Sequence, residues 1–128
     1  MINTFRLRGI DCFGVFVNSL KDKKSKLWLD ENLHSFNIKA IVNGTAFSAT
    51  GDFSGRSPLN SFGCPVFQVS FSTARKSEWD AAERGLSPTD LAMYVALPEL
   101  DGNLYAGTIS FKSNKFDNIT TSLKKIFN

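Results

Sequence analysis

FNIKAIVNGTAFSA, residues 36–49, carries the strongest local structural signal in this chain. Its first eight residues alternate apolar side chains with mostly polar ones, which is the period of a half-buried β-strand. The pair Asn43-Gly44 follows, and then a second short run over residues 45–49. An Asn-Gly pair between two such runs favours a type I′ turn, because both central residues of that turn need positive φ. The stretch therefore predicts a hairpin with its tip at Asn43-Gly44.

Downstream of the hairpin, residues 66–73 predict a third strand with two distinct faces. The inner face would be apolar and the outer face polar: Phe67, Val69 and Phe71 against Gln68, Ser70 and Ser72. Ser77 is a candidate N-cap for a helix over residues 77–85, which Gly85 can end.

Beyond that helix, residues 93–97 are interpreted as a strand, although a short helix capped at Ser87 fits the same region. A turn at Asp101-Gly102, a strand over 104–112 and an amphipathic helix over 116–126 complete the order.

Upstream of the hairpin, short alternating runs predict strands at 5–8 and 12–17. Residues 19–26 are polar and rich in lysine, and residues 27–29 are apolar, which suggests a hairpin with a lysine-rich tip. From residue 36 on, the predicted order is strand, strand, strand, helix, strand, strand. This is the order expected of an oligonucleotide-binding barrel. The predicted fold class is therefore α+β and mainly antiparallel β: an OB-like barrel, or a curved sheet with two helices. Residues 1–128 are predicted to form a single domain.

Composition places the chain among ordinary globular proteins, with 42% hydrophobic and 21% charged residues. No apolar run is long enough for a membrane span, and the N-terminus does not resemble a signal peptide. We therefore expect a soluble, cytoplasmic protein without a membrane partner. Cys12 and Cys64 are expected to be reduced and structural, because disulfides are rare in that compartment.

Groups that could support catalysis are few. His34 is the only histidine, and although it could pair with Cys64 in three dimensions, no motif promotes that pair. The two cysteines and one histidine lack the spacing of a zinc site. A glycine-rich segment over 51–57 could hold an anion but matches no phosphate-loop motif. We therefore predict no enzymatic activity, no metal site and no cofactor, and no residue motif identifies a family.

Charge placement favours a binding function. Residues 1–76 carry ten Lys or Arg against five Asp or Glu, whereas residues 77–101 carry one against six. A basic body of this kind can bind a polyanion, and aromatic rings can stack on the bases of a single strand. The chain is thus predicted to be a small nucleic-acid-binding domain favouring single strands. The predicted contact residues are Arg6, Arg8, Lys21, Lys23, Lys24, Lys26, Trp28, Lys39, Phe53, Arg56, Phe62, Arg75 and Lys76.

An alternative from another class fits the same observations. The chain could be a protein-binding module that inhibits or adapts a larger complex, including one that processes nucleic acid. In that case the loop over residues 51–65 and an exposed sheet edge would supply the contacts. The two hypotheses differ in the partner, single-stranded nucleic acid or a protein complex. The sequence does not define the oligomeric state.

Overall fold

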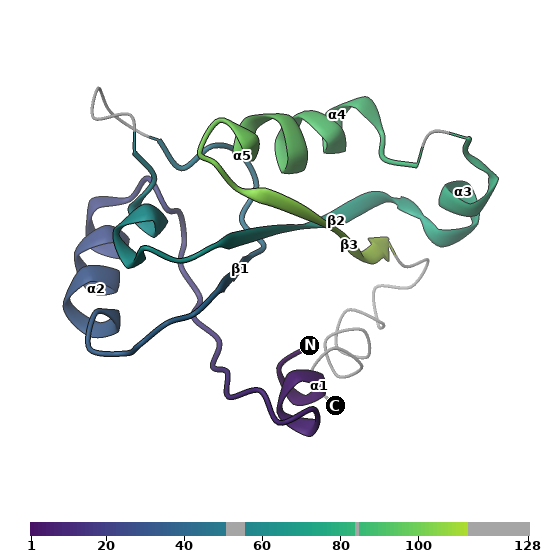
Figure 1. Cartoon of the computed structure of the whole chain (residues 1–128). Helices are drawn as coiled ribbons and strands as arrows, with labels where there is room; N and C mark the ends of the chain where they lie inside the picture. Colours follow the sequence, from purple (N-terminus) through teal and green to yellow (C-terminus); the bar gives the residue numbers. More distant parts are fainter. Residues whose placement is uncertain (51–55, 84, 113–128) are drawn as a thin grey trace. The chain divides into compact units, whose positions relative to one another are not determined.

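The computed structural model describes residues 1–50, 56–83 and 85–112. The chain divides into two compact units, which are described separately here (Figure 1). The terminal unit comprises Met1–Phe16 and Ser113–Asn128, and the sheet unit comprises Val17–Lys112. That residues 1–128 form one domain stays a prediction, and the predicted helix over 116–126 lies outside the described residues. No helix in the described parts of the chain has the length and apolar character needed to cross a bilayer.

The described part of the terminal unit contains α1 (Ile2–Leu7), so the strand predicted at 5–8 is wrong. Gly9 has a φ of 74° and donates its N–H to the Arg6 carbonyl at 3.0 Å, which ends the helix in the left-handed conformation that glycine tolerates. The Arg6 guanidinium also donates to the Cys12 carbonyl at 2.9 Å. Residues 12–17 form no strand, so the strand predicted there is wrong as well. Four alternating residues were too few to distinguish a strand from one helical turn.

Three strands form the sheet of the sheet unit: β1 (Ile41–Asn43), β2 (Val66–Arg75) and β3 (Leu104–Lys112). They lie in the order β1-β2-β3, and both pairs are parallel, with Ile41 opposite Val66 and Phe67 opposite Leu104. The predicted antiparallel fold, whether OB-like barrel or curved sheet, is therefore wrong. The protein has an α/β arrangement in which helices connect parallel strands.

The predicted hairpin at Asn43-Gly44 is also wrong, for a local reason. The Asn43 side chain accepts hydrogen bonds from the N–H and the hydroxyl of Thr45, at 3.1 and 3.0 Å. Here the Asn43 side chain stabilises the turn. In a type I′ hairpin, the asparagine would instead occupy a central position with positive φ. Gly44 does not have positive φ. The chain then continues through a long crossover before it enters β2 as a parallel neighbour.

The lysine-rich segment forms a helix, α2 (Lys23–Leu33), where a hairpin tip was predicted. The carboxylate of Asp22 caps it by accepting the N–H of Ser25 at 2.9 Å. Leu29 and Leu33, four residues apart, share one face and are buried. They pack with apolar residues of the segment before α2, the crossover and β2 into the main core: Leu20, Leu29, Leu33, Ala49, Leu59 and Val66. The crossover contains a 3₁₀ helix, η1 (Pro58–Phe62).

A second crossover joins β2 to β3. It begins with α3 (Lys76–Ala81), which is shorter than the helix predicted over 77–85. A helical run follows, made of α4 (Pro88–Leu91), the π-helical η2 (Ala92–Ala96) and α5 (Leu97–Glu99). The strand predicted at 93–97 is therefore wrong, and the alternative of a helix capped at Ser87 is right, because Ser87 Oγ accepts the Asp90 N–H at 3.1 Å. Figure 1 shows α4 and α5 over one face of the sheet.

β2 and β3 lie where predicted, but the polar face of β2 is buried as well as Val69 of the apolar face, which is 5% exposed. Gln68 is 1% exposed and Ser70 is 0% exposed, whereas Phe71, predicted to lie in the core, is 37% exposed. Ser72 contacts Asp90 of α4 at 3.4 Å, so this face lies under the helical run. The prediction that these polar residues point outward is wrong, because hydrogen bonds satisfy them in the interior.

Candidate functional site

The loop after β1, residues 44–50, forms hydrogen bonds to β1, β2, the helical run and the turn before β3. In α/β sheets, ligand sites form beyond the carboxyl ends of parallel strands. This loop occupies that position for β1, which ends at Asn43. The loop is therefore the centre of the candidate site.

Side-chain amides hold the beginning of the loop. Asn43 Nδ2 and Asn103 Nδ2 both donate to Gln68 Oε1, at 2.9 and 3.2 Å. Gln68 Nε2 in turn donates to the Thr45 carbonyl at 2.9 Å. Asn103 Oδ1 is buried and has no hydrogen-bond partner in the described parts of the chain. The amides thus join β1, β2 and the turn before β3 at one point.

The end of the loop is held by the carboxylate of Asp101. It accepts hydrogen bonds from the hydroxyls of Ser48 and Thr50, at 2.6 and 2.9 Å, and from the backbone N–H of Ala49. The two hydroxyls also contact each other. Asp101 is 6% exposed, so these bonds replace the water that a buried carboxylate would otherwise need. We call this arrangement the Asp101 clamp.

A second buried carboxylate fixes the other end of the helical run. Asp90 is fully buried. It accepts hydrogen bonds from the N–H and hydroxyl of Thr73, each at 2.9 Å. Asp90 and Asp101 therefore attach the two ends of residues 88–101 to other segments. Tyr94, on the helix between them, has a pKa raised above its usual value, chiefly by burial and further by the charge of Asp90.

Phe47 has an unusual backbone conformation at the middle of the loop. Its φ is 66°, and no other described non-glycine residue has a positive φ. Such a conformation costs on the order of 1 kcal/mol for a residue with a Cβ. The hydrogen bond from Phe47 N to Met93 O, at 2.8 Å, holds it in place. The ring is half exposed, so the loop presents an apolar side chain at the surface.

A cavity of about 370 Å³ opens between this loop and the segment before α2. Residues 45–49 form one wall, and residues 18–21 form the other. Lys21 lies on the second wall, and its ammonium makes no ion pair with a described residue. A cavity of this volume is within the range of small-molecule sites.

Only one predicted contact residue, Lys21, lines the cavity. Arg6 and Arg8 belong to the terminal unit, where Arg6 bonds the Cys12 carbonyl. Lys23, Lys24 and Lys26 are on α2 with the half-exposed Trp28, so these four are brought together. Arg75 and Lys76 lie at the far end of β2, where Lys76 pairs with Asp80 and lies 5.3 Å from the centre of the Phe111 ring.

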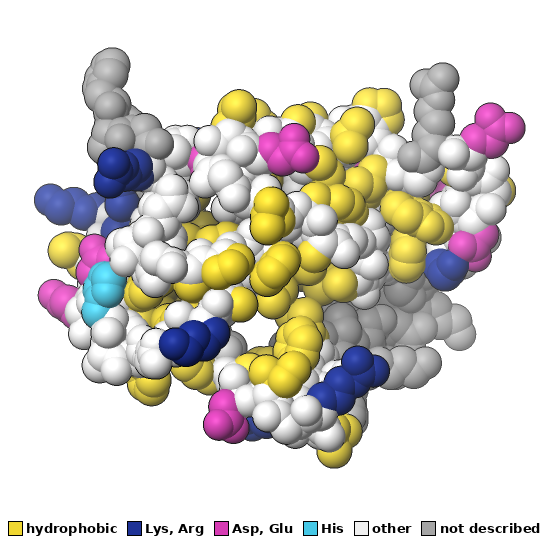
Figure 2. All heavy atoms as spheres, in the orientation of Figure 1, with side chains coloured by type: hydrophobic (Ala, Val, Ile, Leu, Met, Phe, Trp, Pro, Cys, Tyr) yellow, Lys and Arg dark blue, Asp and Glu magenta, His cyan; other side chains and the backbone are white. Residues whose placement is uncertain are grey.

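The remaining predicted residues are dispersed. Lys39 is exposed in the segment before β1, and Arg56 is exposed before η1. Phe62 stacks on His34 with ring centroids 4.8 Å apart, and Phe53 lies outside the described residues. On the visible face of the sheet unit, Lys and Arg side chains lie apart, near α2 and near α3, with mostly uncharged side chains between them (Figure 2). The structure therefore does not assemble the predicted contact residues into one surface.

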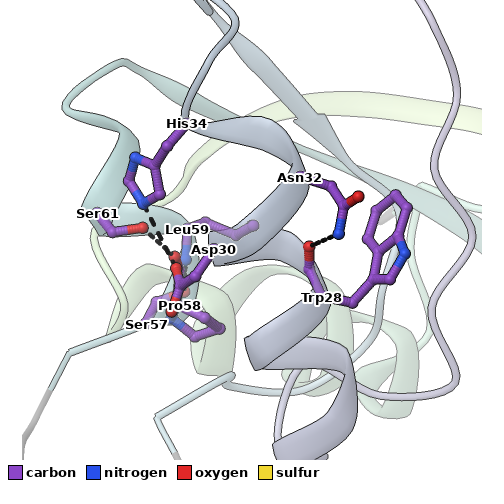
Figure 3. Close-up of polar contacts among 8 residues, drawn as sticks. All are labelled: Trp28, Asp30, Asn32, His34, Ser57, Pro58, Leu59 and Ser61. Atoms are coloured by element: carbon purple, nitrogen blue, oxygen red, sulfur yellow. Dashed lines mark hydrogen bonds and ion pairs between the residues drawn. The ribbon is translucent and has the colours of Figure 1, made fainter.

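The candidate catalytic pair of the sequence is not assembled either. His34 contacts Asp30 of its own helix at 3.5 Å, and both side chains are about half exposed (Figure 3). Ser61, close by in the same view, donates its hydroxyl to the Pro58 carbonyl at 2.9 Å. Cys12 and Cys64 are both free thiols in the structure, and their reduced state in the cell stays a prediction. Burial raises the pKa of the Cys64 thiol, which disfavours the reactive thiolate.

Comparison with known proteins identifies the family. The family described as CobN/Magnesium Chelatase matches residues 1–126. An aerobic cobaltochelatase subunit CobN from Sinorhizobium sp. is 37% identical over 115 residues, which are 88% of this chain and 9% of that protein. The chain belongs to the CobN/magnesium chelatase family. The corresponding subunit from Pseudomonas aeruginosa is 32% identical over 105 residues, 82% of this chain and 8% of that protein. This member of the family thus spans about a tenth of the length of these relatives, and no solved structure matches it.

Family membership corrects the predicted function. A nucleic-acid-binding module favouring single strands is wrong, and an inhibitor or adaptor of a nucleic-acid-processing complex has no support. The prediction of no enzymatic role is not supported, because the family is named for chelatases. A protein complex as partner fits relatives that are named as subunits. The charge asymmetry along the sequence does not correspond to one charged helix, since α2 carries three lysines with two acids and α3 one lysine with two acids.

Sequence reasoning missed most of the residues that form this site. The alternation of β2 places Gln68 on an outer face, and Asn43 predicts only a turn. Asp101 belongs to the predicted turn and Asn103 follows it. Nothing in the local sequence indicates that their side chains bond distant segments. Phe47 gave no signal, because positive φ at a phenylalanine has no sequence signature. No group of three His, Cys, Asp or Glu side chains suited to a metal ion occurs among the described residues.

Proposed function

We propose that this chain acts as one segment of a metal chelatase, most specifically of a cobalt chelatase. The observation that supports the proposal is the family match over residues 1–126, with 37% identity to a cobaltochelatase subunit over 88% of the chain. A chelatase brings a metal ion and an organic chelating ligand together, and both are its substrates. The chain would work within, or together with, the other polypeptides of such an enzyme.

Within the chelatase, we assign this segment a binding and positioning role. Its two most buried carboxylates, Asp90 and Asp101, accept hydrogen bonds from hydroxyls and backbone N–H groups of the chain itself. Their lone pairs are therefore used to hold the helical run and the loop after β1. The loop and its cavity are therefore the parts available to a ligand, and the two carboxylates maintain their geometry. The predicted cytoplasmic location stays a prediction.

The proposal is tested in the organism that encodes the chain. Deletion of the gene should lower cobalt chelatase activity in the extract, and the wild-type gene should restore it. Restoration by Leu29→Asp should fail, because Leu29 is 3% exposed in the core and a buried charge there would unfold the sheet unit. A tagged copy should also co-purify with other chelatase polypeptides.

Two results would contradict the proposal. One is unchanged cobalt chelatase activity after deletion together with purification of the tagged chain free of chelatase polypeptides. The other is loss of magnesium chelatase activity alone. That result would contradict cobalt as the metal but would agree with a role in a metal chelatase.

A further inference from the structure

The cavity beside the loop after β1 has two chemically different walls. On the wall formed by residues 18–21, three groups can donate hydrogen bonds: the Asn18 amide, the Ser19 hydroxyl and the Lys21 ammonium. The Ser19 oxygen already accepts the Lys21 N–H at 3.1 Å, which leaves its own proton for a ligand. Neither the Asn18 amide nor the Lys21 ammonium makes a hydrogen bond to a described residue.

The facing wall is mostly apolar. Ala46 and Phe47 supply apolar surface, and the Phe47 ring is half exposed. The hydroxyls of Thr45 and Ser48 also line this wall, but each donates its proton elsewhere, to Asn43 and Asp101 respectively. The donors for a ligand are thus concentrated on one wall, while the ring and methyl groups are on the other.

From this arrangement we infer that the cavity binds a small organic carboxylate with a flat apolar body. The carboxylate accepts hydrogen bonds from Lys21, Ser19 and Asn18, and the apolar body lies against Phe47. Charge-assisted hydrogen bonds from an ammonium to a carboxylate are stronger than neutral ones. The aspartates near the site keep their negative charge, but their oxygens are directed at donors of the chain itself, those of Asp101 at Ser48 and Ala49 and those of Asp22 at Ser25.

The site is also held in shape before a ligand arrives. The Asp101 clamp and the Phe47–Met93 hydrogen bond fix one wall. On the other wall, Leu20 is 5% exposed and belongs to the main core. Binding therefore has to order the exposed side chains of Asn18 and Lys21 but not the loop wall, which lowers its entropic cost. The inference concerns a ligand of the isolated chain and does not depend on the proposed chelatase role.

The test uses the 128-residue chain and 3-phenylpropionate as the probe. In ¹H–¹⁵N correlation spectra, saturable shifts are expected at the amides of residues 18–21 and 45–49. Lys21→Gln should weaken binding about tenfold, the loss expected for one charge-assisted contact. The matched control is Lys23→Gln, an exposed lysine two residues away that does not line the cavity; its affinity should equal that of the wild type.

The neutral amide of the probe separates charge recognition from hydrophobic contact. 3-Phenylpropionamide keeps the ring and should bind about tenfold more weakly than the acid. The inference is overturned if the cavity amides do not shift in a saturable way, if Lys21→Gln binds like the wild type, or if the amide and the acid bind equally. Each of these results would leave the chelatase proposal unaffected, because that proposal is tested by gene deletion.

Discussion

Removal of the Asp101 carboxylate is the sharpest test of the described loop. In Asp101→Ala, the Ala49 N–H loses its acceptor, and so do the hydroxyls of Ser48 and Thr50. Ala49 is only 5% exposed, so its N–H is left without a partner in a region with little access to water. The two hydroxyls are less affected, because they can still bond each other.

The magnitude follows from these three groups. A buried donor without a partner costs about 1–3 kcal/mol, and a hydrogen bond to a charged group contributes about 1.5–3 kcal/mol. Because the hydroxyls keep one partner, we count them at about 0.5–1 kcal/mol together. The expected loss in the free energy of unfolding is therefore about 2–4 kcal/mol. Asp101→Asn retains one acceptor oxygen and should lose about half as much.

The measurement is urea denaturation followed by circular dichroism, together with amide hydrogen exchange at residues 48–50. Asp30→Ala is the matched control, because it removes a carboxylate that is about half exposed and lies 3.5 Å from His34. Its stability should stay within about 0.5 kcal/mol of the wild type. A free energy of unfolding for Asp101→Ala within that same margin would refute the clamp, as would unchanged exchange protection at Ala49.

Three further predictions test other parts of the structure. Gly44→Ala should destabilise the protein by about 1 kcal/mol, because its Cβ would lie 2.9 Å from the Phe71 ring, and Phe71→Leu should relieve most of that loss in a double-mutant cycle by urea denaturation. Asp22→Ala should lower the helix content and stability of α2 more than Asp22→Asn does, because asparagine can still cap the Ser25 N–H; equal loss in both variants would show that the cap is unimportant. The raised pKa of Tyr94 means that the folded state holds its proton more tightly than the unfolded state, so stability should fall as the pH rises above about 10 and through the folded pKa. Tyr94→Phe should flatten that alkaline fall, and an identical pH profile would contradict the burial of the hydroxyl.

The strands that sequence reasoning located correctly are those with long alternating patterns. β3 has the predicted bounds, and β2 extends two residues beyond its prediction. Alternation reports that a segment is extended, and Asp101-Gly102 marks where β3 is about to begin. It does not report which neighbour pairs with a strand or in which direction. A local sequence pattern therefore could not predict the parallel sheet.

The unexpected burial of the polar face of β2 has a different cause. Polar residues are assigned to the surface because burying them without partners is costly. In this protein the partners come from far along the chain: Asn103 bonds Gln68 across 35 residues, and Asp90 bonds Thr73 across 17. No pattern within one strand reveals such partners. The same limitation hid the candidate site, whose clamp joins Ser48 to a carboxylate 53 residues away.

The clamp and the cavity are linked by geometry, because Ser48 and Ala49 belong to both. Asp101 does not line the cavity, yet it holds two of the residues that do. If the wall is fixed mainly by Asp101, its removal should weaken the binding of 3-phenylpropionate while Lys21 and its neighbours stay unchanged. The same variant should then lose exchange protection at Ala49, and the affinity and the protection should fall together. A loop that stays ordered and binds the probe normally without Asp101 would show that the hydrogen bond from Phe47 to Met93 suffices to hold the wall.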